Sequence, residues 1–296
     1  MDKNILKERI VAKSAVIEDQ LQSKIINFDK FEIQLLGNED LSDKGCEKIV
    51  NMFVRNNAKA VGVHCALINY DTCRLYDVLY KTDRFEMAKG AIKLANKFSE
   101  LYNEEIYVVI HGYFSSKELE NKILYNNICK NLNELKNGYN NIKICIENVT
   151  PVDFYGDYYY GINGLYMKDC IIKDGNYGTI FDVCHFQTTK IFYNDITNWK
   201  QNELEPTYES EIAYAGKTLN GLHINFATEK GMTATTHGLA SHNIEERMNI
   251  LRRVIKSLVD NELSPYLILE VREKDYTNPI NAISQKEDIF KIIDEI

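Results

Sequence analysis

Residues that can bind metal ions stand at the ends of six short apolar stretches of the sequence. In chain order these residues are His64, His111, Glu147, Asp182, His223 and Glu270. His185 comes three residues after Asp182, and His237 and His242 follow the stretch that contains His223. Imidazole and carboxylate groups are the donors that Zn²⁺, Mn²⁺ and Fe²⁺ take in proteins. The residue types therefore predict metal chemistry.

The size of the set predicts more than one ion. Carboxylates brought together in a protein interior repel one another, and burial drives them toward the protonated form, whereas bound divalent ions remove both costs. The set also exceeds the four ligands that one zinc ion needs. We therefore expect two or three ions, zinc first, with Mn²⁺ or another divalent ion as the alternative.

Several of these residues also have ordinary structural interpretations. A single histidine at a strand end is often a hydrogen-bonded structural residue, and a single acid there often caps a helix. His242, within SHNIEE, can simply precede the start of a helix. Cys65 and Cys184 flank proposed ligands, but alternation along a strand turns them away from the site and predicts a packing role. The tyrosines at 155 and 158–160 could form a lid or a packed surface loop.

Short apolar runs that alternate with longer amphipathic segments predict the elements that carry these residues. The predicted strands are Phe31–Leu36, Ala60–Val63, Ile106–Ile110, Ile142–Ile146, Gly178–Phe181, Gly221–Phe226 and Tyr266–Leu269, with an eighth near Thr233–Thr236. The predicted helices are Ser42–Asn56, Cys73–Tyr102, Ser116–Lys136, Ile244–Asn261 and Gln285–Ile296.

This alternation is typical of a parallel sheet with both faces covered. We expect a single-domain α/β protein, a (β/α)8 TIM barrel, with its metal site at the C-terminal ends of the strands, where such barrels build active sites. The barrel would span 27–296, after an N-terminal helical segment at 3–26, with a loop insertion at 152–177. An open doubly wound sheet is the rival, but the sequence has no GxGxxG turn.

The balance of acidic and basic residues excludes one class of function. The chain of 296 residues has 35 Lys and Arg against 43 Asp and Glu, a formal net charge of −8. This balance excludes a polybasic nucleic-acid binder, although a local basic patch could still serve a specific enzyme. Because the sequence has no long apolar run and no apolar leader after MDKNILKERI, we expect a cytoplasmic protein that does not act in a membrane. The seven cysteines include no CxxC pair, so a disulfide framework is not expected.

From His64 to Glu270 the sequence resembles the xylose isomerase-like barrels and, within them, endonuclease IV, the AP endonuclease family 2. The motifs that carry the resemblance are FDVCH at 181–185, IEN at 146–148, HIN at 223–225, LE at 269–270 and the H-x-x-L-I-N pattern that begins at His64. The D-x-x-H step is shared with sugar epimerases of the superfamily. The histidines of the second and third predicted strands favour the endonuclease.

The resemblance implies a specific ligand arrangement. Glu147 would bridge two ions, and Asp182, His223 and Glu270 would complete the inner cluster. His64 and His111 would hold an outer zinc beside Glu147, and His185 and His237 would bind a third. The sequence departs from the family at Thr235, where the family has a ligating aspartate, and in its first predicted strand, FEIQLL, which lacks the family's histidine.

Two enzymatic functions follow from this reading. The first is a divalent-metal-dependent phosphodiester hydrolase of the endonuclease IV type, acting on DNA with an abasic site, with Glu147 and Glu270 as catalytic residues. The alternative is an isomerase or epimerase of a small sugar or sugar phosphate, in which one ion polarises the substrate and the same two glutamates move a proton. A non-catalytic metal-binding protein is a third possibility. The sequence does not indicate the oligomeric state.

Overall fold

The computed structural model describes residues 3–66, 68–69, 74–75, 83–111, 122–149, 176–196, 206–227 and 238–296. Eight parallel strands close into a barrel, in the order β1-β10-β9-β8-β7-β6-β3-β2. These strands are β1 (Ile10–Ala15), β2 (Lys30–Gln34), β3 (Lys59–His64), β6 (Ile106–His111), β7 (Ile142–Glu147), β8 (Gly178–Asp182), β9 (Leu219–Ile224) and β10 (Tyr266–Leu269). The predicted TIM barrel is confirmed.

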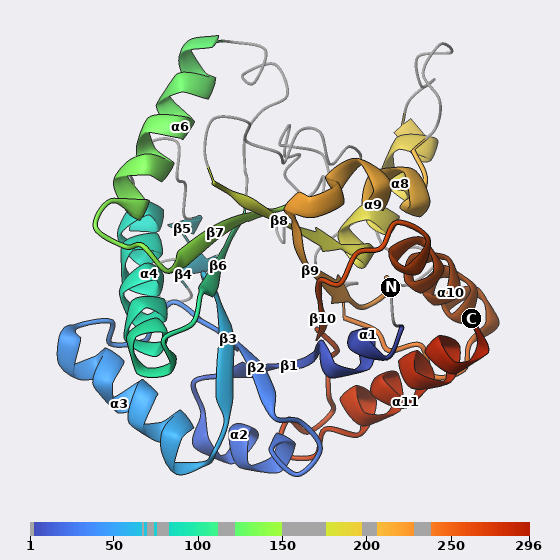
Figure 1. Ribbon diagram of the computed structural model, residues 1–296, viewed down its shortest axis with the longest axis horizontal. Coiled ribbons are helices and arrows are strands. Elements are labelled where there is room, and N and C mark those ends of the chain that lie inside the picture. The colour runs from blue at the N-terminus through green and yellow to red at the C-terminus, as the bar shows by residue number, and fades with distance from the viewer. Residues whose placement is uncertain are drawn as a thin grey trace.

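Helices surround the barrel (Figure 1). They are α1 (Asn4–Glu8), α2 (Glu18–Lys24), α3 (Asp43–Arg55), α4 (Asp83–Tyr102), α6 (Lys122–Lys136), α8 (Val183–Ile196), α9 (Tyr208–Ala215), α10 (Glu245–Asp260) and α11 (Ile280–Glu295), with a 3-10 turn at Gly216–Thr218. Two short strands, β4 (Ile68–Asn69) and β5 (Arg74–Leu75), pair outside the barrel. Within the described residues, no helix is both long and apolar enough to cross a membrane.

Helix α3 illustrates how local sequence forms these elements. The side chain of Ser42 accepts a hydrogen bond from the backbone N–H of Gly45, which satisfies one of the unpaired donors at the start of the helix. Cys46, Ile49 and Phe53 then recur at the spacing of one helix face and are buried. This face packs into the core layer between the helices and the barrel.

The N-terminal segment requires a correction. Residues 3–26, expected to be helical and outside the barrel, contain strand β1, which pairs with β2 and β10 and closes the barrel. Strand β1 was missed because Lys13 interrupts its apolar run with a charge. The barrel is complete with β1, so it does not need the eighth strand that we expected near Thr233–Thr236, a segment outside the described residues.

Two predicted helix boundaries were also wrong. Helix α4 begins at Asp83, not Cys73, because β5 occupies part of the segment before it. Helix α11 begins at Ile280, five residues earlier than expected, directly after Pro279. The insertion expected at 152–177 lies outside the described residues apart from its last two positions.

The barrel interior has an apolar layer and, above it, a polar layer. The apolar layer consists of Val11, Val61, Tyr107, Val109, Cys145, Ile180 and Ile268. Two residues further along five of these strands come Lys13, His111, Glu147, Asp182 and Glu270. Because side chains two apart on a strand share a face, the polar residues also point into the barrel, at the C-terminal ends of the strands.

A β-bulge and a glycine place His64 in the polar layer. The β2–β3 pairing shifts register between Phe31 and Glu32, so that Val61 is an additional residue on β3. A Cβ atom at Gly62 would lie 2.2 Å from the Tyr107 ring, so Gly62 also faces inward. The shift lets Val63 pack outward in the helix layer, and His64 then points into the barrel.

Candidate metal centre

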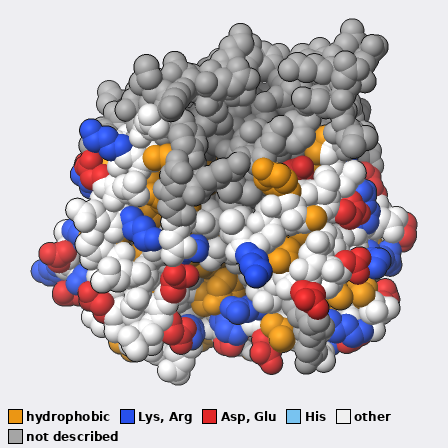
Figure 2. Space-filling model, turned by 45° about the horizontal axis from the view of Figure 1, so that its top comes forward, with side chains coloured by type: hydrophobic (Ala, Val, Ile, Leu, Met, Phe, Trp, Pro, Cys, Tyr) orange, Lys and Arg blue, Asp and Glu red, His pale blue; other side chains and the backbone are white. Residues whose placement is uncertain are grey.

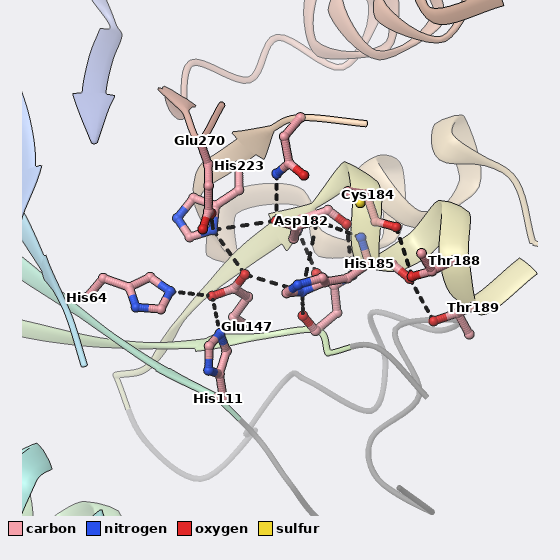
Figure 3. Close-up of polar contacts among 12 residues, drawn as sticks. His64, His111, Glu147, Asp182, Cys184, His185, Thr188, Thr189, His223 and Glu270 are labelled. Atoms are coloured by element: carbon pink, nitrogen blue, oxygen red, sulfur yellow. Dashed lines mark hydrogen bonds and ion pairs between the residues drawn. The ribbon is translucent and has the colours of Figure 1, made fainter. Parts of the chain in front are cut away.

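Strand ends deliver the candidate ligands to one place inside the barrel mouth. Figure 3 shows that His64, His111, Asp182, His185, His223 and Glu270 surround Glu147. His64 ends β3, His111 ends β6, Glu147 ends β7 and Asp182 ends β8. His223 lies near the end of β9, and Glu270 follows β10. Sequences far apart in the chain thus converge because the strands are parallel.

Glu147 is the centre of this arrangement. Its Oε2 atom lies 3.0 Å from Nε2 of His64 and 2.9 Å from Nε2 of His111. Its Oε1 atom lies 2.9 Å from Nδ1 of His223 and 3.4 Å from Nδ1 of His185. Each carboxylate oxygen therefore faces two imidazole rings, and the side chain is fully buried.

The side chains form two groups that share Glu147 and have the spacing of metal ligands. In the outer group, donor atoms of His64, His111 and Glu147 all lie within 4.8 Å of one another. In the inner group, the same limit holds for Glu147, Asp182, His223 and Glu270. His223 is central to the inner group, because its Nδ1 lies 2.9 Å from Oε2 of Glu270 and 3.8 Å from Oδ2 of Asp182.

Asp182 has a structural contact in addition to its place in the inner group. Its Oδ1 accepts a hydrogen bond of 2.6 Å from the backbone N–H of His185, so Asp182 caps helix α8. Its Oδ2 accepts a hydrogen bond of 2.9 Å from the Asn225 side chain and faces His223. One oxygen thus anchors the carboxylate and the other points into the site.

His185 lies beside both groups. Its Nδ1 lies 2.7 Å from the backbone carbonyl of Asn148, and a carbonyl can only accept a hydrogen bond, so Nδ1 carries the hydrogen. This contact fixes the tautomer with the lone pair on Nε2. Asn148 in turn donates to the backbone carbonyl of Asp182, so the first turn of α8 is tied to the end of β7.

Two charged residues of the site were missed from the sequence. Lys13 of β1 lies with its Nζ 2.7 Å from Oε1 of Glu270 and 3.5 Å from Oε1 of Glu32. Glu32 of β2 lies on the other side of His223, with its Oε1 3.1 Å from Nε2. Each of the two is a charged residue inside a strand. For Lys13, the expectation of a helical N-terminal segment conceals this signal.

The electrostatics of the site depend on burial and on these close charges. Burial by itself would raise the pKa of Glu147, but His223 and His111 outweigh it and hold that pKa well below its usual range. For His223, burial would lower the pKa, but Glu147 and Glu32 raise it well above the ordinary 6.5. Burial lowers the pKa of His64, so its ring is neutral at pH 7.

The pair of Lys13 and Glu32 is charged. Burial would lower the pKa of the Lys13 ammonium, but Glu270 and Glu32 raise it above its ordinary value. Burial would raise the pKa of Glu32, but His223 and Lys13 lower it. Four carboxylates, those of Glu32, Glu147, Asp182 and Glu270, thus converge with one permanent ammonium group.

The donor set fits divalent ions. Nδ1 of His64 lies 2.9 Å from the carbonyl of Cys65 and must carry the hydrogen, which leaves the lone pair of the neutral ring on Nε2. That lone pair faces a carboxylate oxygen of Glu147 at 3.0 Å, a contact that a cation between the two atoms would make favourable. Ligands about 2.0–2.1 Å from a tetrahedral zinc lie roughly 3.3 Å apart, similar to the contacts around Glu147.

The other predicted residues have different outcomes. His237, proposed as a ligand of a third ion, and the Thr235 position both lie outside the described residues, as do the tyrosines at 155 and 158–160. His242 is exposed, with φ of 47°, in the turn before α10, and it belongs to none of the donor groups among the described residues. Cys65 and Cys184 are buried, and Cys65 packs in the layer between helices and barrel, as expected.

Comparison with solved structures finds the same architecture in enzymes of different activities. An AP endonuclease of family 2 from Brucella melitensis is 10% identical, with a TM-score of 0.58, over 91% of this chain and 95% of that chain. A D-tagatose 3-epimerase-like protein is 17% identical, with a TM-score of 0.54, over 97% of both chains. A xylose isomerase domain protein from Planctomyces limnophilus is 9% identical, with a TM-score of 0.54, over 97% of this chain and 98% of that chain.

No protein-family model matches the chain, and no curated protein matches its sequence. At these identities, the structural likeness bears on the fold and not on the reaction. The chain has the TIM-barrel fold that an AP endonuclease of family 2 shares with xylose isomerase-like and epimerase-like proteins.

Proposed function

We propose that this protein is a divalent-metal-dependent phosphodiester hydrolase, with DNA that carries an abasic site as its substrate. His64, His111, Glu147, Asp182, His185, His223, His237 and Glu270 are the proposed ligands, and zinc is the proposed ion. The observation that carries the proposal is the position of Glu147, which is shared by two donor groups. A carboxylate shared in this way can bridge two ions.

The two-group arrangement suits the transfer of a phosphoryl group. Divalent ions held there would activate a water for attack and stabilise the negative charge that develops on the leaving oxygen. The chain's own contribution is to orient. Glu147 is fully buried and contacts four imidazoles, whereas Glu270 retains 19% exposure. We assign both carboxylates to positioning of the nucleophile.

The distribution of charge on the surface bears on how a DNA substrate would bind. In Figure 2, basic and acidic side chains are interspersed over the described part of the face shown, and the chain has a net charge of −8. A long, nonspecific contact with nucleic acid is not favoured by this distribution. The attraction for a phosphate would instead come from the ions at the barrel mouth.

The second candidate is an isomerase or epimerase of a small sugar or sugar phosphate. One observation favours it: oxygens of Glu147 and Glu270 both lie 2.9 Å from Nδ1 of His223. Two carboxylates that flank one ligand position could hold a single ion and move a proton between two faces of a substrate. His64 and His111 would have no necessary role in that reaction.

The test is a paired assay of the metal-loaded wild type and Glu270→Gln. Each is incubated with a duplex containing one abasic site, and with ketohexoses and their phosphates in D₂O. We expect the wild type to cleave the duplex, and Glu270→Gln to be slower by about 100-fold or more, as for loss of one electrostatic contact in an active site.

Deuterium incorporation into a sugar, observed by NMR without cleavage of the duplex, would support the epimerase in place of the hydrolase. Elemental analysis gives an independent measure, because hydrolysis at the shared carboxylate requires two or more ions per chain. One ion per chain in a fully loaded sample would contradict the two-group proposal. Asp288→Asn, which alters a buried carboxylate of α11 that accepts a hydrogen bond from Ser241, is the matched control.

A further inference from the structure

We propose that Lys13 and Glu32 are positioning residues that orient two ligands of the inner metal group, His223 and Glu270. The proposal rests on the metal site proposed above and extends it to two residues on strands β1 and β2. Neither residue needs to contact the ion. Their effect is on which nitrogen of His223 and which oxygen of Glu270 face it.

Glu32 and the inner group lie on opposite sides of the His223 ring. The Oε1 and Oε2 atoms of Glu32 lie 3.1 and 3.2 Å from Nε2 of His223. The other ring nitrogen, Nδ1, lies 2.9 Å from the nearest oxygens of both Glu147 and Glu270. A carboxylate that accepts from one ring nitrogen keeps the hydrogen there and leaves the lone pair of a neutral ring on the other. Glu32 therefore selects Nδ1 as the ligand atom.

Lys13 orients the carboxylate of Glu270 in a similar way. Its Nζ lies 2.7 Å from Oε1 of Glu270, while Oε2 of the same carboxylate faces Nδ1 of His223. The ammonium thus occupies one oxygen and turns the other toward the inner group. The same ammonium lies 3.5 Å from Glu32, so one lysine holds both carboxylates at a fixed separation.

The nitrogen of His223 that Glu32 faces distinguishes a supporting role of Glu32 from a role as ligand. Glu32, His64 and His223 have donor atoms within 4.8 Å of one another and, by spacing alone, could hold an ion. Glu32 faces Nε2 of His223, so an ion in this group would take that nitrogen, whereas an ion in the inner group would take Nδ1. The hydrogen of the neutral His223 ring then lies on Nδ1 in the first case and on Nε2 in the second.

The test compares Glu32→Gln and Glu32→Ala with the wild type in Zn²⁺ affinity, measured by competition with a chromophoric chelator. Loss of a carboxylate behind a metal-binding histidine weakens affinity by about 10- to 100-fold, which we expect for Glu32→Ala. The amide oxygen of Gln can still accept from Nε2, so Glu32→Gln should recover part of the loss. Asp288→Asn, with its buried carboxylate in α11, should bind Zn²⁺ as the wild type does.

A spectroscopic readout separates orientation from general destabilisation. The ring ¹⁵N signals of His223 in the Zn²⁺-loaded protein report which nitrogen carries the hydrogen. We expect Nε2–H in the wild type and in Glu32→Gln, and a shifted or mixed signal in Glu32→Ala. For Lys13→Met, we expect a changed visible spectrum of bound Co²⁺, because either oxygen of Glu270 can then face the ion, and an unchanged spectrum for Asp288→Asn.

The outcomes distinguish this proposal from the proposed function. If the wild type binds Zn²⁺ and both Glu32 variants bind it equally well with unchanged ¹⁵N signals, the positioning role is wrong and the metal site stands. If the wild type binds no divalent ion, the metal site itself is wrong, and the positioning role with it. Thermal unfolding of each variant in EDTA shows whether it folds, and Glu32→Gln preserves the shape of the side chain if Glu32→Ala does not fold.

Discussion

The Nδ1 atom of His223 lies 2.9 Å from Oε1 of Glu147, although 76 residues separate them in the chain. The pKa of His223 is well above 6.5, because Glu147 and Glu32 outweigh the opposing effect of burial. The pKa of Glu147 is well below its usual range, because His223 and His111 outweigh burial there. Without an ion, the pair therefore contains a proton held between two buried groups. A divalent ion must displace that proton to bind at Nδ1.

Binding of a divalent ion to the inner group should release protons. At pH 7 we expect release of about one proton per ion, since His223 must be neutral to act as a ligand. Calorimetric titration with Zn²⁺ in buffers of different ionisation enthalpy measures this number directly. Affinity should rise with pH as His223 becomes easier to deprotonate. A binding enthalpy that is the same in all buffers would contradict the role of His223.

Glu147→Gln and His111→Ala should differ in the number of ions they lose. Glu147 belongs to both donor groups, so Glu147→Gln should remove most of the bound metal. His111 belongs to the outer group, so His111→Ala should leave the inner ion in place. Elemental analysis of the purified variants checks this difference. Equal metal content in the two variants would show that Glu147 is not shared.

Gly62→Ala should destabilise the barrel. A Cβ atom there would lie 2.2 Å from two carbons of the Tyr107 ring, which is buried in the apolar layer. Overpacking of this kind lowers the free energy of unfolding by about 1–3 kcal/mol. Urea denaturation provides the measurement. The double variant with Tyr107→Val should regain part of the loss, and strict additivity of the two changes would argue against the contact.

Lys24 should make stability depend on pH in the alkaline range. Burial lowers its pKa to about 8, against about 10.5 in the unfolded chain. Between these values the unfolded state binds more protons, so the free energy of unfolding rises with pH. The rise is at most about 3 kcal/mol, from 1.36 kcal/mol per pKa unit. Urea denaturation at pH 7.5 and pH 10 should show this gain in the wild type and not in Lys24→Met, and equal gains would exclude Lys24 as its source.

Much of this protein could be predicted from its sequence because the parallel barrel imposes a strong local pattern. An apolar run that ends in His, Glu or Asp signals a strand whose last inward side chain lies at the barrel mouth. Six such residues, His64, His111, Glu147, Asp182, His223 and Glu270, were expected to converge, and they form the two donor groups. The fold class and these six residues of the candidate site therefore followed from periodicity and residue type.

The tertiary structure determined the contacts between residues that are distant in the sequence, which a local pattern does not predict. In the sequence, Lys13 interrupts the apolar run of a strand. In the structure, its ammonium lies beside Glu270 and Glu32, which are distant in the sequence. The direction of His64 depends on a bulge at Val61, set by pairing with a neighbouring strand. Strand propensity and apolar spacing are properties of neighbours along the chain. Charge pairing, register and the sharing of Glu147 between two groups arise only when strands from the whole chain close around one interior.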